Sequence, residues 1–174
     1  MKKLLLTILT IILIPLMSNG EESGWSRIEK GWSRMPIRVY LNETGDYTKM
    51  IEAGFKDWEE KSDGEVRFKF VTKPHSGYAK ITVNLVQNFK DATAGRTEAQ
   101  MGVNKIYKSS IDIGLNASNG RKFTQPELDI IIRHEIGHAL GLSHDKDKKS
   151  IMYPYVLPGQ SITEKDIENL MELY

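Results

Sequence analysis

The 174-residue chain contains no cysteine. Disulfide bonds and thiolate metal sites are therefore excluded, and cysteine usage says nothing about the redox compartment. An excess of charge of one sign is also lacking, because 24 basic residues nearly balance 23 acidic ones. Charge therefore gives no reason to expect a nucleic acid or membrane partner. The length and the 40% hydrophobic content suit one globular domain, and we expect a monomer.

An apolar run long enough to span a membrane is lacking as well. Two lysines precede an apolar run of 14 residues from Leu4 to Met17, which contains Pro15. A membrane-spanning helix needs about 20 apolar residues. The small residues Ser18 and Gly20 follow, and this pattern is typical of a secretory signal peptide.

We therefore expect an exported protein in three parts. Residues 1–20 are predicted to be the signal peptide, residues 21–34 an N-terminal segment, and residues 35–174 the folded domain. No stable membrane association is expected after cleavage, whereas an uncleaved signal would leave the chain anchored in the membrane.

Hydrophobic periodicity predicts both strands and helices. Strands are expected at residues 36–41, 66–70, 81–85, 94–100 and 111–115. Helices are expected at residues 46–61, 124–140 and 163–174, the second opened by a Thr124–Glu127 capping box and ended by Gly141. Gly54 in the first helix is expected to mark a close approach to the sheet. The order predicts an α+β fold, or α/β sandwich, with the sheet early and the chemistry late.

The chemistry is expected in residues 134–145, HEIGHALGLSHD, which hold three of the four histidines. His134 and His138 lie on one face of a helix, so both imidazoles can bind one metal ion. Glu135 is rotated by about 100° around the axis, where a general base for a metal-activated water should stand. Gly141 lets the chain turn back, and His144 completes three nitrogen ligands that leave one tetrahedral position open, as in catalytic zinc sites.

A lone H-E-x-x-H occurs by chance in unrelated proteins. Here it is extended to H-E-x-x-H-x-x-G-x-x-H on a helix with clear start and stop signals. This extended motif resembles the zinc-binding motif of the metzincin peptidases. The run SIMYPY at Ser150–Tyr155 resembles their methionine turn, and its M-Y-P resembles the matrixin branch. PIRVYL, GFKDWEE and ITEKDIENLMELY are similar to the first strand, first helix and last helix of that branch, so the resemblance covers residues 32–174.

The resemblance implies a metzincin-like fold. Its parts are a mixed, mostly parallel five-stranded twisted sheet with an antiparallel edge strand, two long helices, and a small C-terminal subdomain with the methionine turn and a final helix. It implies that His134, His138 and His144 bind one catalytic zinc ion and that Glu135 is the base. Met152 would form an apolar floor beneath the metal.

The same resemblance implies how a substrate binds. The segment near Ala94–Gln100 would pair with an extended peptide by strand addition, and Pro154–Val156 would line the pocket beside the scissile bond. The chain differs from many animal matrixins, because no cysteine is present to hold the enzyme latent through the zinc. Calcium could be bound through oxygen atoms of Asp112, Asn116 and Asn119.

We therefore expect an exported zinc metalloendopeptidase that acts on peptides or proteins in extended conformation. One alternative is an adhesion or interaction module that keeps the zinc without turnover, although the presence of Glu135 argues against it. The other alternative is a zinc hydrolase of a small molecule.

Overall fold

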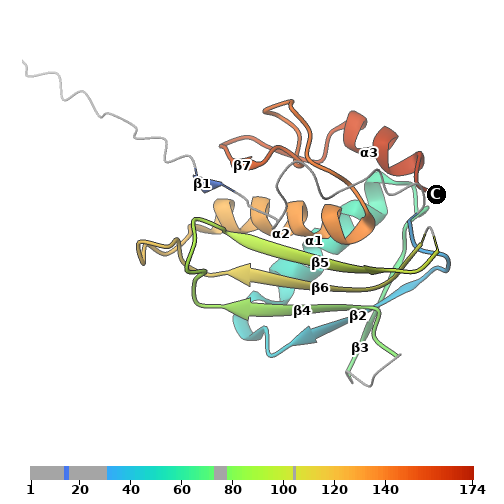
Figure 1. Cartoon of the computed structure of the whole chain (residues 1–174), viewed down its shortest axis with the longest axis horizontal. Helices are drawn as coiled ribbons and strands as arrows, with labels where there is room; N and C mark the ends of the chain where they lie inside the picture. Colours follow the sequence, from blue (N-terminus) through green and yellow to red (C-terminus); the bar gives the residue numbers. More distant parts are fainter. Residues whose placement is uncertain (1–13, 16–30, 73–77, 104) are drawn as a thin grey trace, which may run out of the picture.

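The centre of the molecule is a five-stranded sheet (Figure 1). The computed structural model describes residues 14–15, 31–72, 78–103 and 105–174. The strands, in hydrogen-bonded order, are β3 (Phe68–Val71), β2 (Ile37–Asn42), β4 (Ile81–Val86), β6 (Ile106–Gly114) and β5 (Gly95–Met101). All neighbours are parallel except β5, which runs antiparallel to β6 at one edge. The predicted α+β fold, with its antiparallel edge strand, is confirmed.

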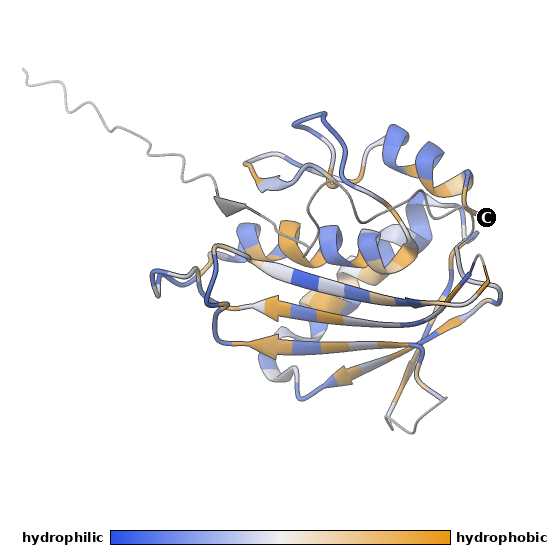
Figure 2. Cartoon of the chain, in the orientation of Figure 1, coloured by the Kyte–Doolittle hydropathy of each residue, from blue (hydrophilic) through white to orange (hydrophobic). Residues whose placement is uncertain are grey.

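Strands β2, β4 and β6 alternate between a buried and a more exposed face, visible as bands of hydropathy in Figure 2. The buried face carries branched apolar side chains that pack under the helices: Ile37, Val39, Ile81, Val83, Ile111 and Ile113. On the other face, Asn42 donates a hydrogen bond to Asn84 at 2.9 Å, and Asn84 donates one to Asp112 at 2.7 Å. This polar row ties β2, β4 and β6 together on the side away from the helices.

Two helices cover the buried face of the sheet (Figure 1). They are α1 (Thr48–Lys61), preceded by the 3₁₀ turn η1 (Gly45–Tyr47), and α2 (Gln125–Leu140). Gly54 marks their crossing, because a Cβ there would lie 2.8 Å from Ile132 Cγ2 of α2. The expectation that Gly54 approaches the sheet was wrong, since the absent side chain makes room for a helix. The Trp58 indole also donates to the Arg133 carbonyl at 2.9 Å, which fixes the crossing.

The chain after α2 forms a small subdomain with β7 (Tyr155–Val156) and α3 (Glu164–Met171). Thr163 caps α3 through a reciprocal capping box with Asp166. The predicted last helix therefore starts where expected but ends earlier. A two-residue strand, β1 (Ile14–Pro15), pairs antiparallel with β7. The rest of the expected signal peptide and residues 21–30 lie outside the described residues, and among the described helices none has the length and apolar character to cross a bilayer.

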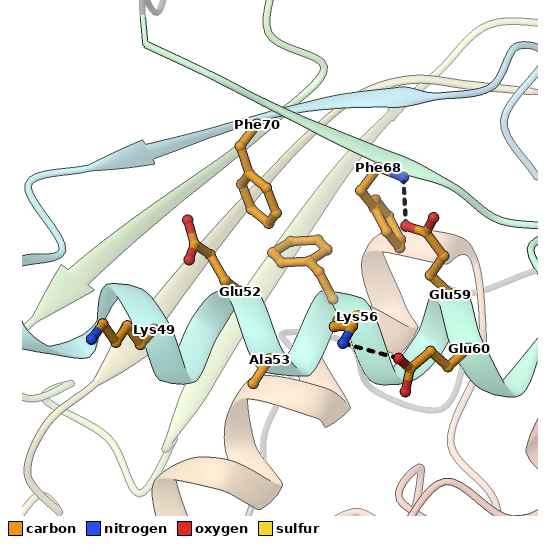
Figure 3. Close-up of a pocket in the computed structure, with 9 residues that line it drawn as sticks. Lys49, Glu52, Ala53, Lys56, Glu59, Glu60, Phe68 and Phe70 are labelled. Carbon is orange, nitrogen blue, oxygen red and sulfur yellow. Dashed lines mark hydrogen bonds and ion pairs between the residues drawn. The ribbon is translucent and has the colours of Figure 1, made fainter.

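A surface hollow lies between α1 and β3 (Figure 3). The Phe55 ring meets the rings of Phe68 and Phe70 edge to face, at centroid distances of 4.8 and 5.7 Å. Charged side chains of α1 line the rest, including Lys56 and Glu60, which form an ion pair. None of the candidate histidines lines this hollow, so the chemistry lies elsewhere.

Candidate active site

The three histidines of the motif meet at the C-terminal half of α2. The predicted capping box at Thr124 and Glu127 is present, and Gly141 ends the helix with a φ of 107°. This left-handed conformation suits glycine, because a Cβ would be strained there. The turn brings the loop back over the helix, so that one ligand atom from each of His134, His138 and His144 lies within 4.8 Å of the others.

All four carbonyls of the last turn of α2 have partners. Leu142 N and Gly141 N donate to the carbonyls of residues 137 and 138, at 3.0 and 2.9 Å. The side chain of Trp32 donates to the Ala139 carbonyl at 2.8 Å, and the Tyr174 hydroxyl donates to the Leu140 carbonyl at 3.1 Å. A helix end normally leaves these acceptors unsatisfied. Both ends of the domain thus hold the helix that carries the histidines.

Backbone carbonyls fix the orientation of the two helical imidazoles. His134 Nδ1 lies 2.7 Å from the Ile151 carbonyl, and His138 Nδ1 lies 2.8 Å from the Leu142 carbonyl. A carbonyl oxygen can only accept, so each Nδ1 carries the proton and each Nε2 presents a lone pair. Such outer hydrogen bonds are typical of histidines that bind metal ions.

The Nε2 atoms behave as ligands for a cation. His134 Nε2 is buried without a hydrogen-bond partner among the described residues. His138 Nε2 and His144 Nε2 lie 3.2 Å apart. Three imidazole nitrogens that converge in this way can all bind one zinc ion and leave its fourth position open. The residues therefore fit the metal that the sequence predicts.

Burial also keeps these imidazoles neutral. Desolvation lowers the pKa of His134 well below the usual value, and neighbouring His138 and His144 reinforce it. Desolvation, with the charge of His144, lowers the pKa of His138 to about 3. Desolvation lowers the pKa of His144 as well, although this residue is exposed at the surface. Neutral imidazole is the form that binds a metal ion.

Glu135 points from α2 toward the edge strand β5 rather than into solvent. The residue is fully buried, and Thr97 Oγ1 lies 2.6 Å from its Oε2. A Cβ at Gly95 would lie 2.5 Å from Oε1, so only glycine leaves room for this carboxyl group. Desolvation raises the pKa of Glu135 to about 8, against the opposing hydrogen bond from Thr97. The group can therefore hold a proton near neutral pH.

Met152 packs beneath the same turn of α2. Its side chain is buried, and a Cβ at Gly137 would lie 2.4 Å from its Sδ. The Met152 amide donates a hydrogen bond to the Ser150 hydroxyl oxygen at 2.8 Å, within the predicted methionine turn. Asp166 anchors this turn, because its carboxylate accepts from the Ser150 hydroxyl at 2.5 Å and from the Ile151 amide at 3.3 Å. Ile151 is also the residue whose carbonyl orients His134.

The predicted substrate-binding segments lie at the surface. The strand expected at residues 94–100 is β5, an edge of the sheet whose outer side no other strand of the described chain pairs. The segment Pro154–Val156 contains β7, in which Tyr155 is 39% exposed and Val156 is buried. The side chain that can meet a ligand here is thus Tyr155.

The three residues considered for calcium each have a separate hydrogen-bond partner. Asp112 accepts a hydrogen bond from Asn84, Asn116 donates to the Gln87 carbonyl, and Asn119 accepts from the Arg121 amide. Among the described residues, the histidine triad is the one group of three histidine, aspartate or glutamate side chains within reach of one ion. The structure gives no support for calcium.

Thr97, Gly95 and Asp166 were missed as site residues by the sequence analysis. The alternation along β5 turns Gly95 and Thr97 to the helix side of the sheet. The same periodicity in the sequence could have shown which face they occupy. What it could not show is that this face meets Glu135.

Known proteins resemble this chain along most of its length. A family model described as Matrixin matches residues 34–174. Metalloendoproteinase 2-MMP from Arabidopsis thaliana is 41% identical over 142 residues, covering 78% of this chain and 36% of that protein. Metalloendoproteinase 1 from Glycine max is 39% identical over 51 residues, covering 28% of this chain and 17% of that protein. The chain thus spans about a third or less of the length of these curated relatives.

A solved structure shares the fold. Metalloproteinase-II from Bacteroides fragilis has a TM-score of 0.52 at 14% identity, covering 92% of this chain and 57% of that one. At this identity the likeness concerns the fold alone.

Proposed function

The chain belongs to the matrixin family, and from that premise we propose that it is an exported zinc endopeptidase in which Glu135 is the general base. The observation that carries the proposal is the convergence of three imidazole nitrogens within 4.8 Å, next to a buried carboxyl group. The curated relatives Metalloendoproteinase 2-MMP and Metalloendoproteinase 1 are named for the same class of activity.

His134, His138 and His144 would hold the zinc ion through their Nε2 atoms. When bound, zinc supplies Lewis acidity that polarises a carbonyl group and makes a water molecule more acidic. The Ile151 and Leu142 carbonyls keep the first two rings turned for this task. Met152 is proposed to form the apolar floor beneath the site.

Glu135 moves the proton. Its Oε1, which has no hydrogen-bond partner among the described residues, would take a proton from the attacking water. The same carboxyl group would then deliver this proton to the nitrogen of the departing amine. A pKa raised to about 8 by desolvation suits a group that must both accept and release a proton near neutral pH.

The substrate is proposed to be a peptide in extended conformation. The unpaired side of β5 offers backbone donors and acceptors to an added strand. The segment Pro154–Val156 would flank the residue beside the scissile bond, with Tyr155 exposed there. An elongated partner fits this edge better than a small molecule does.

Export rests on the N-terminal sequence. Residues 1–20 are proposed to be a cleaved signal peptide, residues 21–34 an N-terminal segment, and residues 35–174 the zinc metallopeptidase domain. These 174 residues contain no cysteine that could bind the zinc ion.

The test incubates zinc-loaded residues 21–174 with a mixed library of unstructured peptides and reads the products by mass spectrometry. Glu135→Ala should retain zinc and lose turnover, because a general base contributes about 10²- to 10⁴-fold to the rate. Glu60→Ala, on the exposed side of α1, is the matched control and should cleave normally.

Removal of the metal with a chelator should abolish cleavage, and added zinc should restore it. The flanking residues of each cut would report the specificity. Equal cleavage by Glu135→Ala and wild type would contradict the role of the base. An inactive wild type that binds zinc would favour an adhesion module instead.

A further inference from the structure

Thr97 is a buried polar residue on β5 whose side chain forms hydrogen bonds with two oxygen atoms of Glu135. Its side chain is on the helix side of the sheet and the residue is 3% exposed. Oγ1 lies 2.6 Å from Glu135 Oε2 and 3.0 Å from the Glu135 backbone carbonyl oxygen. One hydroxyl group thus bridges the end of the glutamate side chain and its own backbone. This double contact restrains the side-chain torsions of Glu135.

Gly95 completes the pocket for the carboxyl group. It lies two residues before Thr97 on β5, and therefore on the same face of the strand. A Cβ at this position would come within 2.5 Å of Oε1, 2.6 Å of Cγ and 2.8 Å of Cδ of Glu135. Strand β5 therefore approaches Glu135 so closely that the carboxyl group has little freedom to move.

The two oxygens of Glu135 are in different situations. Oε2 is bound to Thr97, whereas Oε1 is buried with no hydrogen-bond partner among the described residues. A buried carboxylate oxygen without a partner is costly. The arrangement is therefore selective, because it holds one oxygen in place and leaves the other for a ligand or a water.

We propose that Thr97 is a positioning residue that sets the orientation of the Glu135 carboxyl group and keeps Oε1 available for proton transfer. This inference rests on the proposed peptidase function of the same site. Thr97 lies on β5, the strand that is also proposed to bind the peptide. The same strand would therefore contact both the base and the substrate. Docking of a substrate on β5 would then act on the same strand that holds the base.

A hydroxyl group suits this position in both states of the base. It can donate one proton and accept others. When Glu135 is charged, Thr97 donates to Oε2. When Glu135 carries a proton on Oε1, the Thr97 hydroxyl can still donate a hydrogen bond to Oε2 or to the Glu135 carbonyl oxygen. A methyl group in place of the hydroxyl supports neither arrangement.

The experiment compares variants that differ only in the hydroxyl group. Thr97→Val removes the hydroxyl group at nearly constant side-chain volume. Thr97→Ser and Thr97→Ala both lack the methyl group, so the difference between these two variants reports the hydroxyl group alone. Ser109→Ala is the matched control, because Ser109 is a buried residue of β6 whose hydroxyl donates to the Glu98 carbonyl at 3.0 Å and does not touch Glu135.

Loss of the hydroxyl should lower kcat about 10- to 100-fold with KM nearly unchanged, because misplacing a catalytic group by about 1 Å has this scale of effect. Thr97→Ser should recover most of kcat relative to Thr97→Ala. Zinc affinity, measured by competition with a chelating dye, should be the same in all variants, since Thr97 does not touch the histidines.

A readout without turnover tests the contact itself. In the metal-free protein, the unfolding free energies of Thr97→Val, Glu135→Gln and the double variant should be non-additive. Those of Ser109→Ala and Glu135→Gln should add. If Thr97→Val does not fold, the Ser and Ala pair at residue 97 carries the same comparison.

Equal kcat for Thr97→Ser and Thr97→Ala, or a loss that appears in KM alone, would overturn the positioning role. Additive free energies for residues 97 and 135 would overturn it as well. Inactivity of both the wild type and Ser109→Ala would instead count against the peptidase function, so the two failures are distinguishable.

Discussion

At the scale of single residues, the site depends on how far each titratable group lies from water. The imidazoles of His134 and His138 are neutral because they are buried, and their protons are held by carbonyl groups. Glu135, the residue after His134, is also buried, and its raised pKa favours the protonated form. The same loss of solvation therefore lowers the pKa of two proposed ligands and raises the pKa of the proposed acid–base group.

The raised pKa of Glu135 predicts how the stability of the metal-free protein depends on pH. The native carboxyl group keeps its proton up to about pH 8, whereas an unfolded glutamate releases it near pH 4.3, roughly. Between these values the native state binds more protons, so stability falls as pH rises. Above about pH 8 both states have released the proton, so this group no longer changes the free energy of unfolding with pH.

Glu135→Gln should remove this loss. Its stability relative to the wild type should increase from about pH 5 to pH 8 by a few kcal/mol, since each pKa unit is worth about 1.4 kcal/mol. Comparing the two proteins cancels the titration of the histidines. Urea unfolding of both at several pH values is the measurement, and parallel stability curves would refute the expectation.

At the scale of elements, the sequence determines α2 more completely than β5. The capping box, the glycine stop and the histidine spacing are local signals, and each appears in the structure as expected. The strand β5 was expected at almost its true position. Its importance for the site comes from the contact between Thr97 and Glu135, two residues that are 38 positions apart along the chain. Local sequence patterns predict which face of a helix or strand a side chain occupies. They do not predict which distant residue that side chain contacts, because this depends on how the elements pack.

The anchoring of the methionine turn by α3 is a second contact of this kind. Asp166 is 1% exposed and binds the Ser150 hydroxyl, the Ile151 amide and the cap of its own helix at Thr163. Since the Ile151 carbonyl orients His134, the Asp166 carboxylate is linked to a proposed metal ligand through residue Ile151.

Asp166→Asn should therefore have two effects. It places a donor against donors, so stability should fall by about 2–3 kcal/mol, and zinc affinity should fall about 10-fold through the looser His134 ring. Asp63→Asn, at an exposed residue after α1, is the control and should change neither quantity. Chemical unfolding and a zinc competition titration measure the two effects. A loss of stability with unchanged zinc affinity would separate Asp166 from the metal site.

At the scale of the whole molecule, the two ends of the domain meet at the C-terminal end of α2. Trp32 and Tyr174 donate to adjacent carbonyls of that helix, and Gly31 N donates to the Leu173 carbonyl at 2.8 Å. Trp32 is buried there. Its role at the helix end could not be predicted from the sequence, because its partner Ala139 is 107 residues away along the chain.

Tyr174→Phe should lower the stability of the domain by about 1 kcal/mol, because the Leu140 carbonyl loses its donor. The ring is kept, so its packing over Gly31 is retained. Thermal or urea unfolding measures the change. Tyr107→Phe, at a half-exposed residue of β6, is the control and should leave stability unchanged. Equal stability of both variants would show that the helix end does not need this hydroxyl group.

The separation between the metal ligands and the partner of the base has a consequence for the order of folding. The three histidines fall within 11 consecutive residues, from His134 to His144, so bringing them together closes only short loops. Thr97 must be brought from far along the chain, and such contacts form late because their loop closure is costly. We therefore expect the folding chain to bind a metal ion before β5 has docked. The proposed peptidase activity would then begin only when the sheet is complete, which would delay cleavage of neighbouring unfolded chains.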